Sequence, residues 1–87
     1  MTEQQKNRLT VEIYGHKYNL MGEASNEHLQ NVASYVNEKM NEINRKAPIL
    51  DTTKIAVLTA VNIADELFRL KQEYEQLQNL LEEKTKE

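Results

Sequence analysis

Two histidines and one adjacent pair of carboxylates are the residues of this chain whose types could support catalysis or bind a metal. A protein-bound zinc ion has three or four ligands, and neither His16 nor His28 has further histidines or carboxylates at ligand spacing. Asp65 and Glu66 are neighbours in sequence and would point to different faces of a helix, so they do not form an acid–base pair. The two glycines do not form a phosphate-binding loop. We therefore expect no enzymatic activity, no catalytic residue, no cofactor and no metal.

Charge and composition narrow the classes of partner. The 87 residues include 14 acidic and 11 basic side chains, a formal net charge of −3. This balance, without a long basic stripe, disfavours nucleic acid as a partner. The chain has no cysteine, and its length allows one small domain. Its polar start does not look like a signal peptide, and its longest apolar stretch, 55–64, is too short to cross a membrane. We expect a cytoplasmic protein that does not bind membranes.

Apolar residues at alternating steps of four and three run through the C-terminal part of the chain. This spacing keeps one stripe of a helix facing a partner helix over several turns, as in a coiled coil. The predicted seam for self-association consists of Ala56, Ala60, Ile63, Leu67, Leu70, Tyr74, Leu77 and Leu81. A chain of this length cannot cover the whole seam with its own residues, so we predict a homodimer. Glu66 and Lys71 flank the seam at positions that meet between parallel chains, which favours the parallel orientation.

The elements that position this seam begin with a predicted β-hairpin. Residues 9–14 alternate between apolar and polar, the period of a half-buried strand. Gly15 and His16 then predict a two-residue turn of type II′, which would pair Ile13 with Tyr18. The predicted apolar face comprises Leu9, Val11, Ile13, Tyr18 and Leu20. A lone two-stranded hairpin is barely stable in water, so this face must rest on a helix.

A first helix is predicted after the hairpin. Ser25 is its expected N-cap, and Glu27 lies in the first turn, where the helix dipole favours a negative charge. Pro48 marks its end, because the residue before a proline is pushed out of the helical region. Apolar residues at three- and four-residue spacing form its buried stripe: Leu29, Val32, Val36, Met40 and Ile43.

The second helix carries the seam. Asp51 is its expected cap, and Leu50 should pack on Ile55 as a hydrophobic staple. From 55 to 68 apolar side chains occur on almost every side, so we expect one face to meet a partner helix and the others to meet the first helix and the hairpin. Asn62 either bonds across a helix pair, bonds the hairpin backbone or faces solvent. Tyr14, on the polar side of the predicted hairpin, either covers local apolar surface or contacts a partner.

The predicted fold class is α+β, with an N-terminal β-hairpin packed on a short helix and on a long C-terminal helix that forms a parallel dimeric coiled coil. We divide the chain into a flexible tail (1–7), a dimerising head (8–70) and a coiled-coil stalk with a frayed end (71–87).

Three segments resemble one known family. They are VEIYGHKYNL in the hairpin, EHLQNVASYVNEKM in the first helix and LDTTKIAVLTAVNIADELFRL at the start of the second. Taken together and in this order, they are similar to the ZapA family of bacterial cell-division proteins. The similarity covers residues from about Leu9 to Leu70, and the last segment is the most specific.

The resemblance implies a function. Proteins of this family bind polymers of the tubulin-like GTPase FtsZ, bundle them, and so stabilise the Z-ring at midcell during septation. The family's heads dimerise, and some members pair dimers into tetramers. Because FtsZ is acidic, the resemblance favours basic residues of the head as its contacts: His16, Lys17, Arg45, Lys46 and Lys54. The alternative is a generic oligomerisation module whose head binds another acidic protein or RNA.

Overall fold

The computed structural model describes residues 7–85 of the chain and shows a hairpin followed by two helices. In order, the elements are β1 (Asn7–Ile13), β2 (His16–Gly22), α1 (Asn26–Lys46) and α2 (Thr52–Thr85). This order confirms the predicted α+β fold. The expected tail and frayed end fall at residues 1–6 and 86–87, which lie outside the described residues, and Asn7 is the first residue of β1.

The hairpin turn differs from the prediction. The strands pair antiparallel with Ile13 opposite His16 and Val11 opposite Tyr18. The turn residues are therefore Tyr14 and Gly15, with φ angles of 53° and 81°, and positive φ at both positions defines type I′ rather than type II′. The predicted turn at Gly15 and His16 is wrong by one residue.

Contacts with α1 explain why a tyrosine adopts this unfavourable conformation. The backbone N–H of Tyr14 donates to Oδ1 of Asn37 at 2.7 Å. The Tyr14 side chain packs against a buried cluster of Met40, Ile43 and Ile55. Moving the turn by one residue shifts the strand pairing by two, so Leu9, Val11, Tyr18 and Leu20 still share one face, as predicted. Tyr14 thus covers apolar surface within the chain, the first of its two predicted roles.

The predicted boundaries of α1 are confirmed. The Ser25 hydroxyl accepts a hydrogen bond from the backbone N–H of His28 at 3.1 Å, as an N-cap does. The helix ends at Lys46, and Ala47 is its C-cap immediately before Pro48. The buried row of the helix is Ala33, Met40 and Ile43, so the predicted stripe is wrong at Val32, which is 45% exposed.

The start of α2 is also as predicted. The Asp51 carboxylate accepts from the backbone N–H of Lys54 at 2.9 Å, and Leu50 packs against the cluster that contains Ile55. Ile55 is fully buried, and the whole helix has 34 residues, about 51 Å at 1.5 Å per residue.

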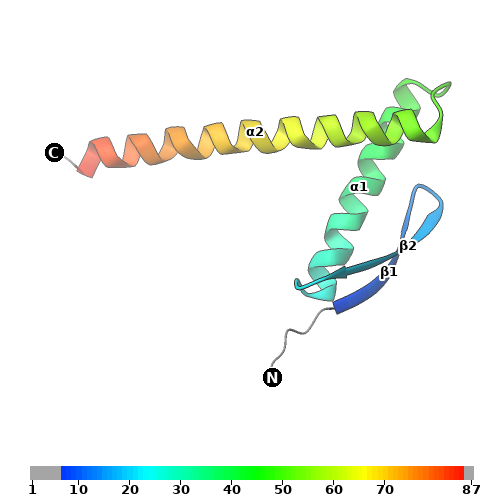
Figure 1. The fold of residues 1–87 in the computed structure, drawn as a ribbon. Helices are drawn as coiled ribbons and strands as arrows, with labels where there is room; N and C mark the ends of the chain where they lie inside the picture. The colour runs from blue at the N-terminus through cyan, green and yellow to red at the C-terminus, as the bar shows by residue number, and fades with distance from the viewer. Residues whose placement is uncertain (1–6, 86–87) are drawn as a thin grey trace.

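The two helices form an L, with α1 descending from the first turns of α2 and the hairpin lying beside α1 (Figure 1). The molecule measures 55 × 47 × 16 Å, so it is flat. The core lies at the corner of the L, where Met40, Ile43 and Ile55 meet the hairpin turn. Beyond this corner α2 extends away from the rest of the chain as far as Thr85 (Figure 1).

Candidate functional site

The predicted seam lies on α2 and faces solvent in a single copy. Of its eight residues, Ile63 alone is half-buried and the other seven are exposed. Leu67 is 53% exposed, and every residue from 67 to 84 is exposed. Leu70, Tyr74 and Leu77 line a hollow of about 550 Å³ on the stalk. An apolar row of this length on a protein surface is typical of an association site.

A polar cluster holds α1 and α2 at the corner of the L. The Tyr35 hydroxyl of α1 donates to one carboxylate oxygen of Glu66 on α2, and Lys39 forms an ion pair with the other. The Lys39 ammonium also lies 5.4 Å from the centroid of the Tyr35 ring. We call Tyr35, Lys39 and Glu66 the corner cluster. The prediction that Glu66 lies beside the seam for Lys71 of a second chain is not supported by this structure, because its carboxylate is bound within its own chain.

The corner cluster shifts the titration of its members. The hydrogen bond from Lys39 is the main cause that lowers the pKa of Glu66 below its ordinary value, and the bond from Tyr35 adds to it. The bond to Glu66 raises the pKa of Tyr35 and that of Lys39. All three side chains therefore keep their ordinary charge states at neutral pH, and the cluster stays intact.

The faces of α2 are divided differently from the prediction. One row of α2 lies towards the chain's own core and α1, with Ile55 and Thr59 buried and Glu66 in the corner cluster. We expected the remaining apolar residues to contact the first helix and the hairpin. Instead, a second row stays exposed, which we call the α2 stripe: Val57, Val61, Ala64 and Phe68. Asn62 is also exposed in a single copy.

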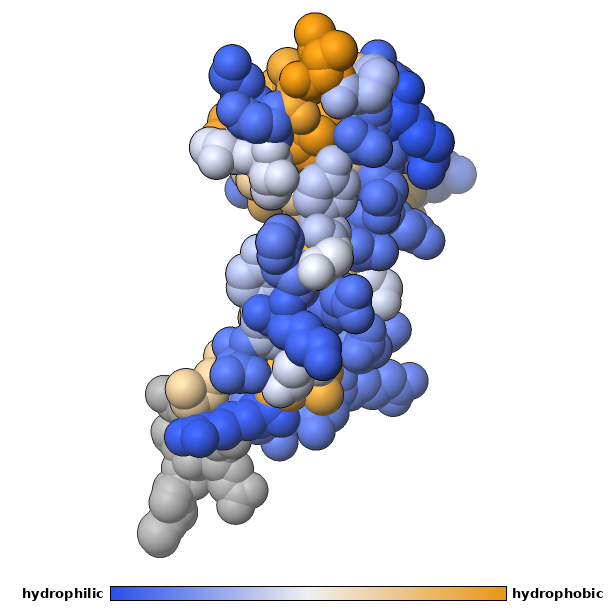
Figure 2. Space-filling view, turned by 90° about the vertical axis from the view of Figure 1, so that its right-hand side faces the viewer, coloured by the Kyte–Doolittle hydropathy of each residue, from blue (hydrophilic) through white to orange (hydrophobic). Residues whose placement is uncertain are grey.

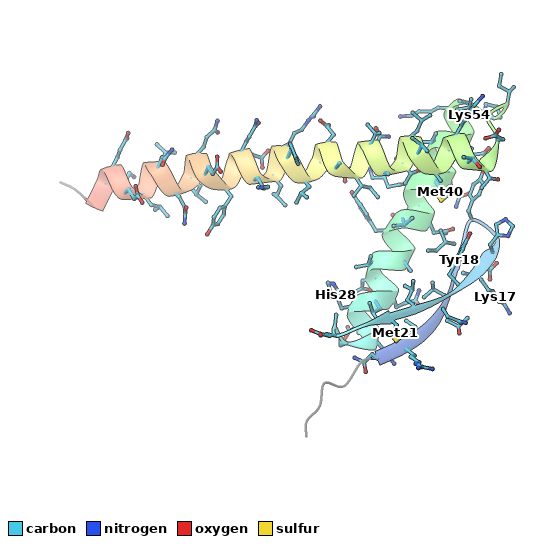
Figure 3. The ribbon with its side chains drawn as sticks, viewed as in Figure 1. Lys17, Tyr18, Met21, His28, Met40 and Lys54 are labelled. Atoms are coloured by element: carbon cyan, nitrogen blue, oxygen red, sulfur yellow. The ribbon has the colours of Figure 1, made fainter. Side chains whose placement is uncertain are left out.

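The predicted partner-binding residues lie on three elements, α1, α2 and β2. Arg45 and Lys46 occupy the last turn of α1, and Lys54 lies in the first turn of α2. His16 and Lys17 begin β2, next to the turn that packs on the core cluster. All five are exposed. Figure 3 shows Lys54 at the corner and Lys17 on the outer side of the hairpin.

The sequence analysis missed one candidate contact residue, which lies in the loop between Lys46 and Lys54. Ile49, in the loop between the helices, is 93% exposed. Next to this loop, a hollow of about 290 Å³ is lined by Leu50, Thr53, Lys54, Val57 and Leu58. Figure 2 shows apolar surface at this end of the molecule, bordered by polar residues. The sequence did contain a signal for this residue. Ile49 directly follows Pro48 and belongs to neither predicted helix, so no helical face was expected to bury it.

We call Arg45, Lys46, Ile49 and Lys54 the loop patch. An exposed apolar side chain surrounded by charges has the composition of a protein-binding surface, where a few anchors contribute most of the affinity.

Among residues 7–85, no group of three or more histidines, cysteines or carboxylates is arranged to hold a metal ion. Neither helix, as far as the structure describes it, combines the length and hydropathy needed to cross a bilayer.

Comparison with known proteins identifies the family. The family described as Cell division protein ZapA matches residues 9–87. A Cell division protein ZapA from Geobacillus sp. (strain WCH70) is 52% identical over 85 residues, which span 97% of this chain and 98% of that protein. Its counterpart from Bacillus pumilus (strain SAFR-032) is 48% identical over 84 residues, 97% of this chain and 99% of the relative.

A solved structure agrees in fold as well as in sequence. The ZapA mutant dimer from Geobacillus stearothermophilus is 49% identical and superposes with a TM-score of 0.75, covering 94% of this chain and 95% of that one. With a family match that begins in β1 and relatives of nearly the same length, this chain belongs to the ZapA family of cell division proteins.

Proposed function

We propose that the protein is a cytoplasmic cell-division adaptor that binds FtsZ filaments at midcell and crosslinks them, which stabilises the Z-ring. It acts without catalysis, by holding filaments side by side. The family is the first support for this role. The second is the geometry of the chain, in which the loop patch and the seam lie on different parts of the molecule.

The observation that carries the proposal is the exposed seam on α2. Leu67, Leu70 and Leu77 are each more than half exposed, so a single copy leaves a long apolar row in water. Pairing two copies along this row covers it, and a homologous structure is a dimer. A two-fold dimer displays two copies of every surface, so it can hold two filaments at once. Repetition along both filaments then makes weak single contacts sufficient.

The loop patch is the proposed contact with FtsZ, together with His16 and Lys17 of the hairpin. Arg45, Lys46 and Lys54 would attract an acidic filament, and Ile49 would provide the apolar anchor. Exposed charges mainly increase the rate of association and make it sensitive to salt, whereas a buried anchor slows dissociation. The effect of substituting the basic residues on FtsZ binding should therefore depend on salt, whereas the effect of substituting Ile49 should not.

The test is co-sedimentation with polymerised FtsZ, with light scattering as the measure of bundling. We expect binding and bundling at low salt and progressive loss of both as salt increases. A dimeric protein that neither sediments with FtsZ polymers nor increases their scattering at low salt would contradict the proposal.

Matched variants locate the contact. Arg45→Glu combined with Lys46→Glu should abolish co-sedimentation, whereas Lys84→Glu, a charge reversal at the far end of α2, should leave it nearly unchanged. Ile49→Asp should weaken binding at every salt concentration. Equal effects of charge reversal at Lys84 and at the loop patch would show that net charge, and not this surface, determines binding.

A further inference from the structure

The hairpin has one exposed strand edge, on β2. The first strand, β1, packs on α1 and contains the buried Val11, whereas no residue of β2 is buried. Tyr18 and Met21 project from opposite faces of β2 and are 47% and 59% exposed. Figure 3 shows both of them, and Lys17, along this strand. The sheet has two strands, so the side of β2 that faces away from β1 is an open edge.

The strand register shows which backbone groups point to this edge. In a two-residue hairpin the residues next to the turn, here Ile13 and His16, exchange both backbone hydrogen bonds, and such pairs alternate along the ladder. The residues of β2 whose N–H and C=O groups point away from β1 are therefore Lys17, Asn19 and Met21. Within the described part of the chain, the backbone hydrogen bonds outside helices and strands do not involve these groups. They are available to a further strand.

The β2 edge is the less protected of the two edges of the hairpin. Proteins commonly block a free edge with charges, prolines, bulges or very short strands. The outward positions of β1 are Arg8, Thr10 and Glu12, two of which are charged. Those of β2 include a single charge, Lys17, and all seven residues of the strand pair with β1 in a continuous register without a bulge. An edge of this kind can accept another strand.

Two copies of β2 complement each other in an antiparallel arrangement. The register that pairs all seven residues of both strands places Asn19 opposite Asn19 of the second copy. Lys17 then faces Met21 of the second copy, so the three outward positions of each strand meet those of the other. On the opposite face, which also carries the buried Val11 of β1, Tyr18 lies beside Leu20 of the second copy. No pair in this register brings two like charges together, which would be destabilising.

We propose that the β2 edges of copies from two different dimers pair antiparallel, so that two hairpins form one four-stranded sheet. The contact joins one dimer to the next and uses neither the seam nor the loop patch. The link between dimers rests on the seam proposed above, whereas the strand pairing itself does not. Three residue pairs that each exchange two backbone hydrogen bonds make a small contact, which is weak in dilute solution. It becomes effective where a filament holds many dimers close together.

Site-specific crosslinking tests this arrangement directly, because the natural chain has no cysteine. Asn19→Cys places a thiol opposite its own counterpart, with Cβ atoms roughly 5 Å apart. The full-length protein with Asn19→Cys and Leu67→Cys, the second thiol lying on the seam, is treated with a short bismaleimide at high protein concentration. We expect covalent products of four or more chains. The matched control combines Leu67→Cys with Thr10→Cys, which is exposed on the same face but one strand further from the contact, and should give products of two chains.

The single variants separate the strand pairing from the seam. If Leu67→Cys alone crosslinks and adding Asn19→Cys gives no product larger than two chains, the seam exists and the pairing between dimers is wrong. If Leu67→Cys alone gives no product while Asn19→Cys alone does, the seam fails and the strand pairing stands. Equal amounts of four-chain product with Thr10→Cys and with Asn19→Cys would show random collision and would overturn the pairing.

Two substitutions of one residue give a second, independent measure. Met21→Lys places a lysine opposite Lys17 of the second copy and should lower the association constant between dimers about two- to tenfold, whereas Met21→Glu should raise it. Sedimentation velocity at high protein concentration measures both. Each substitution removes the same exposed apolar side chain, so a simple loss of apolar contact would weaken association equally. Equal weakening by the two variants would overturn the proposed register.

Discussion

The two halves of α2 have the same local structure and very different environments. Residues 52–66 include Ile55, which is fully buried, Thr59, which is buried, and Glu66, which binds Tyr35 and Lys39 of α1. Residues 67–84 are exposed on every side, although they include several leucines. One continuous helix thus begins in the core of its own chain and ends with its apolar residues exposed.

This difference separates two sources of stability. The first half of α2 is stabilised by packing within one copy, and this contribution does not depend on protein concentration. The second half can bury its apolar row only by association, so its contribution depends on concentration. Substitutions in the two halves should therefore affect different measurements.

The largest effect is expected for Ile55→Ala. Removing a fully buried isoleucine side chain leaves a cavity between α1, α2 and the hairpin turn, which should lower the free energy of unfolding by about 2–5 kcal/mol. Urea unfolding followed by circular dichroism measures it. The matched control is Ile49→Ala, at the most exposed isoleucine, with an expected change within about 0.5 kcal/mol. Equal losses at the two positions would show that the core lies elsewhere.

Leu67→Lys should affect association more than folding. Leu67 lies on the seam and is 53% exposed in one copy, so its charge would be buried only in the dimer. We expect the dissociation constant to rise about tenfold or more, equivalent to roughly 1.4 kcal/mol. Sedimentation equilibrium over a range of concentrations measures this, with Gln72→Lys, away from the seam, as control. An unchanged constant for Leu67→Lys would exclude the predicted seam.

The smallest effect is expected at the boundary between the two halves. Glu66 has a lowered pKa in the folded protein, from an ordinary 4.5, because Lys39 and Tyr35 bond its carboxylate. A carboxyl of this kind stabilises the fold above its unfolded pKa, and the contribution is lost as pH falls through the folded pKa. The melting temperature of the wild type should exceed that of Glu66→Gln at neutral pH. This difference should disappear in acid.

The effect of Glu66→Gln should be small, since the carboxylate is partly exposed and solvent screens the pair. When Tyr35→Phe and Lys39→Met are already present, the effect of Glu66→Gln on the melting temperature should no longer depend on pH. If the pH dependence persists, another group causes it.

Much of this fold follows from local signals in the sequence. Ser25 and Asp51 cap their helices because a side-chain oxygen close to a free backbone N–H needs no distant partner. The alternation of residues 9–13 likewise determines which side of β1 is buried. These features depend on neighbours within a few residues, and the structure confirms them.

The features that were missed depend on contacts between distant residues. Asn37 and the core cluster stabilise the turn at Tyr14 and Gly15. The prediction used only the preference for glycine at the first turn position, which carries no information about these contacts. Glu66 binds Tyr35 and Lys39 of another helix, although its position also fits a seam-flanking residue. The apolar residues of α2 divide between the chain's own core and rows exposed in a single copy, and a helical pattern gives no means of telling these apart. The seam and the loop patch remain predictions.

The positive φ of Tyr14 has a consequence for how the protein folds. A tyrosine rarely adopts this conformation unaided, so the isolated segment 7–22 should not close into this hairpin. The Asn37 amide and the Met40 side chain stabilise the closed turn, so we expect the strands and α1 to form in one cooperative transition. A nascent chain would thus acquire its hairpin only together with the helix that follows it.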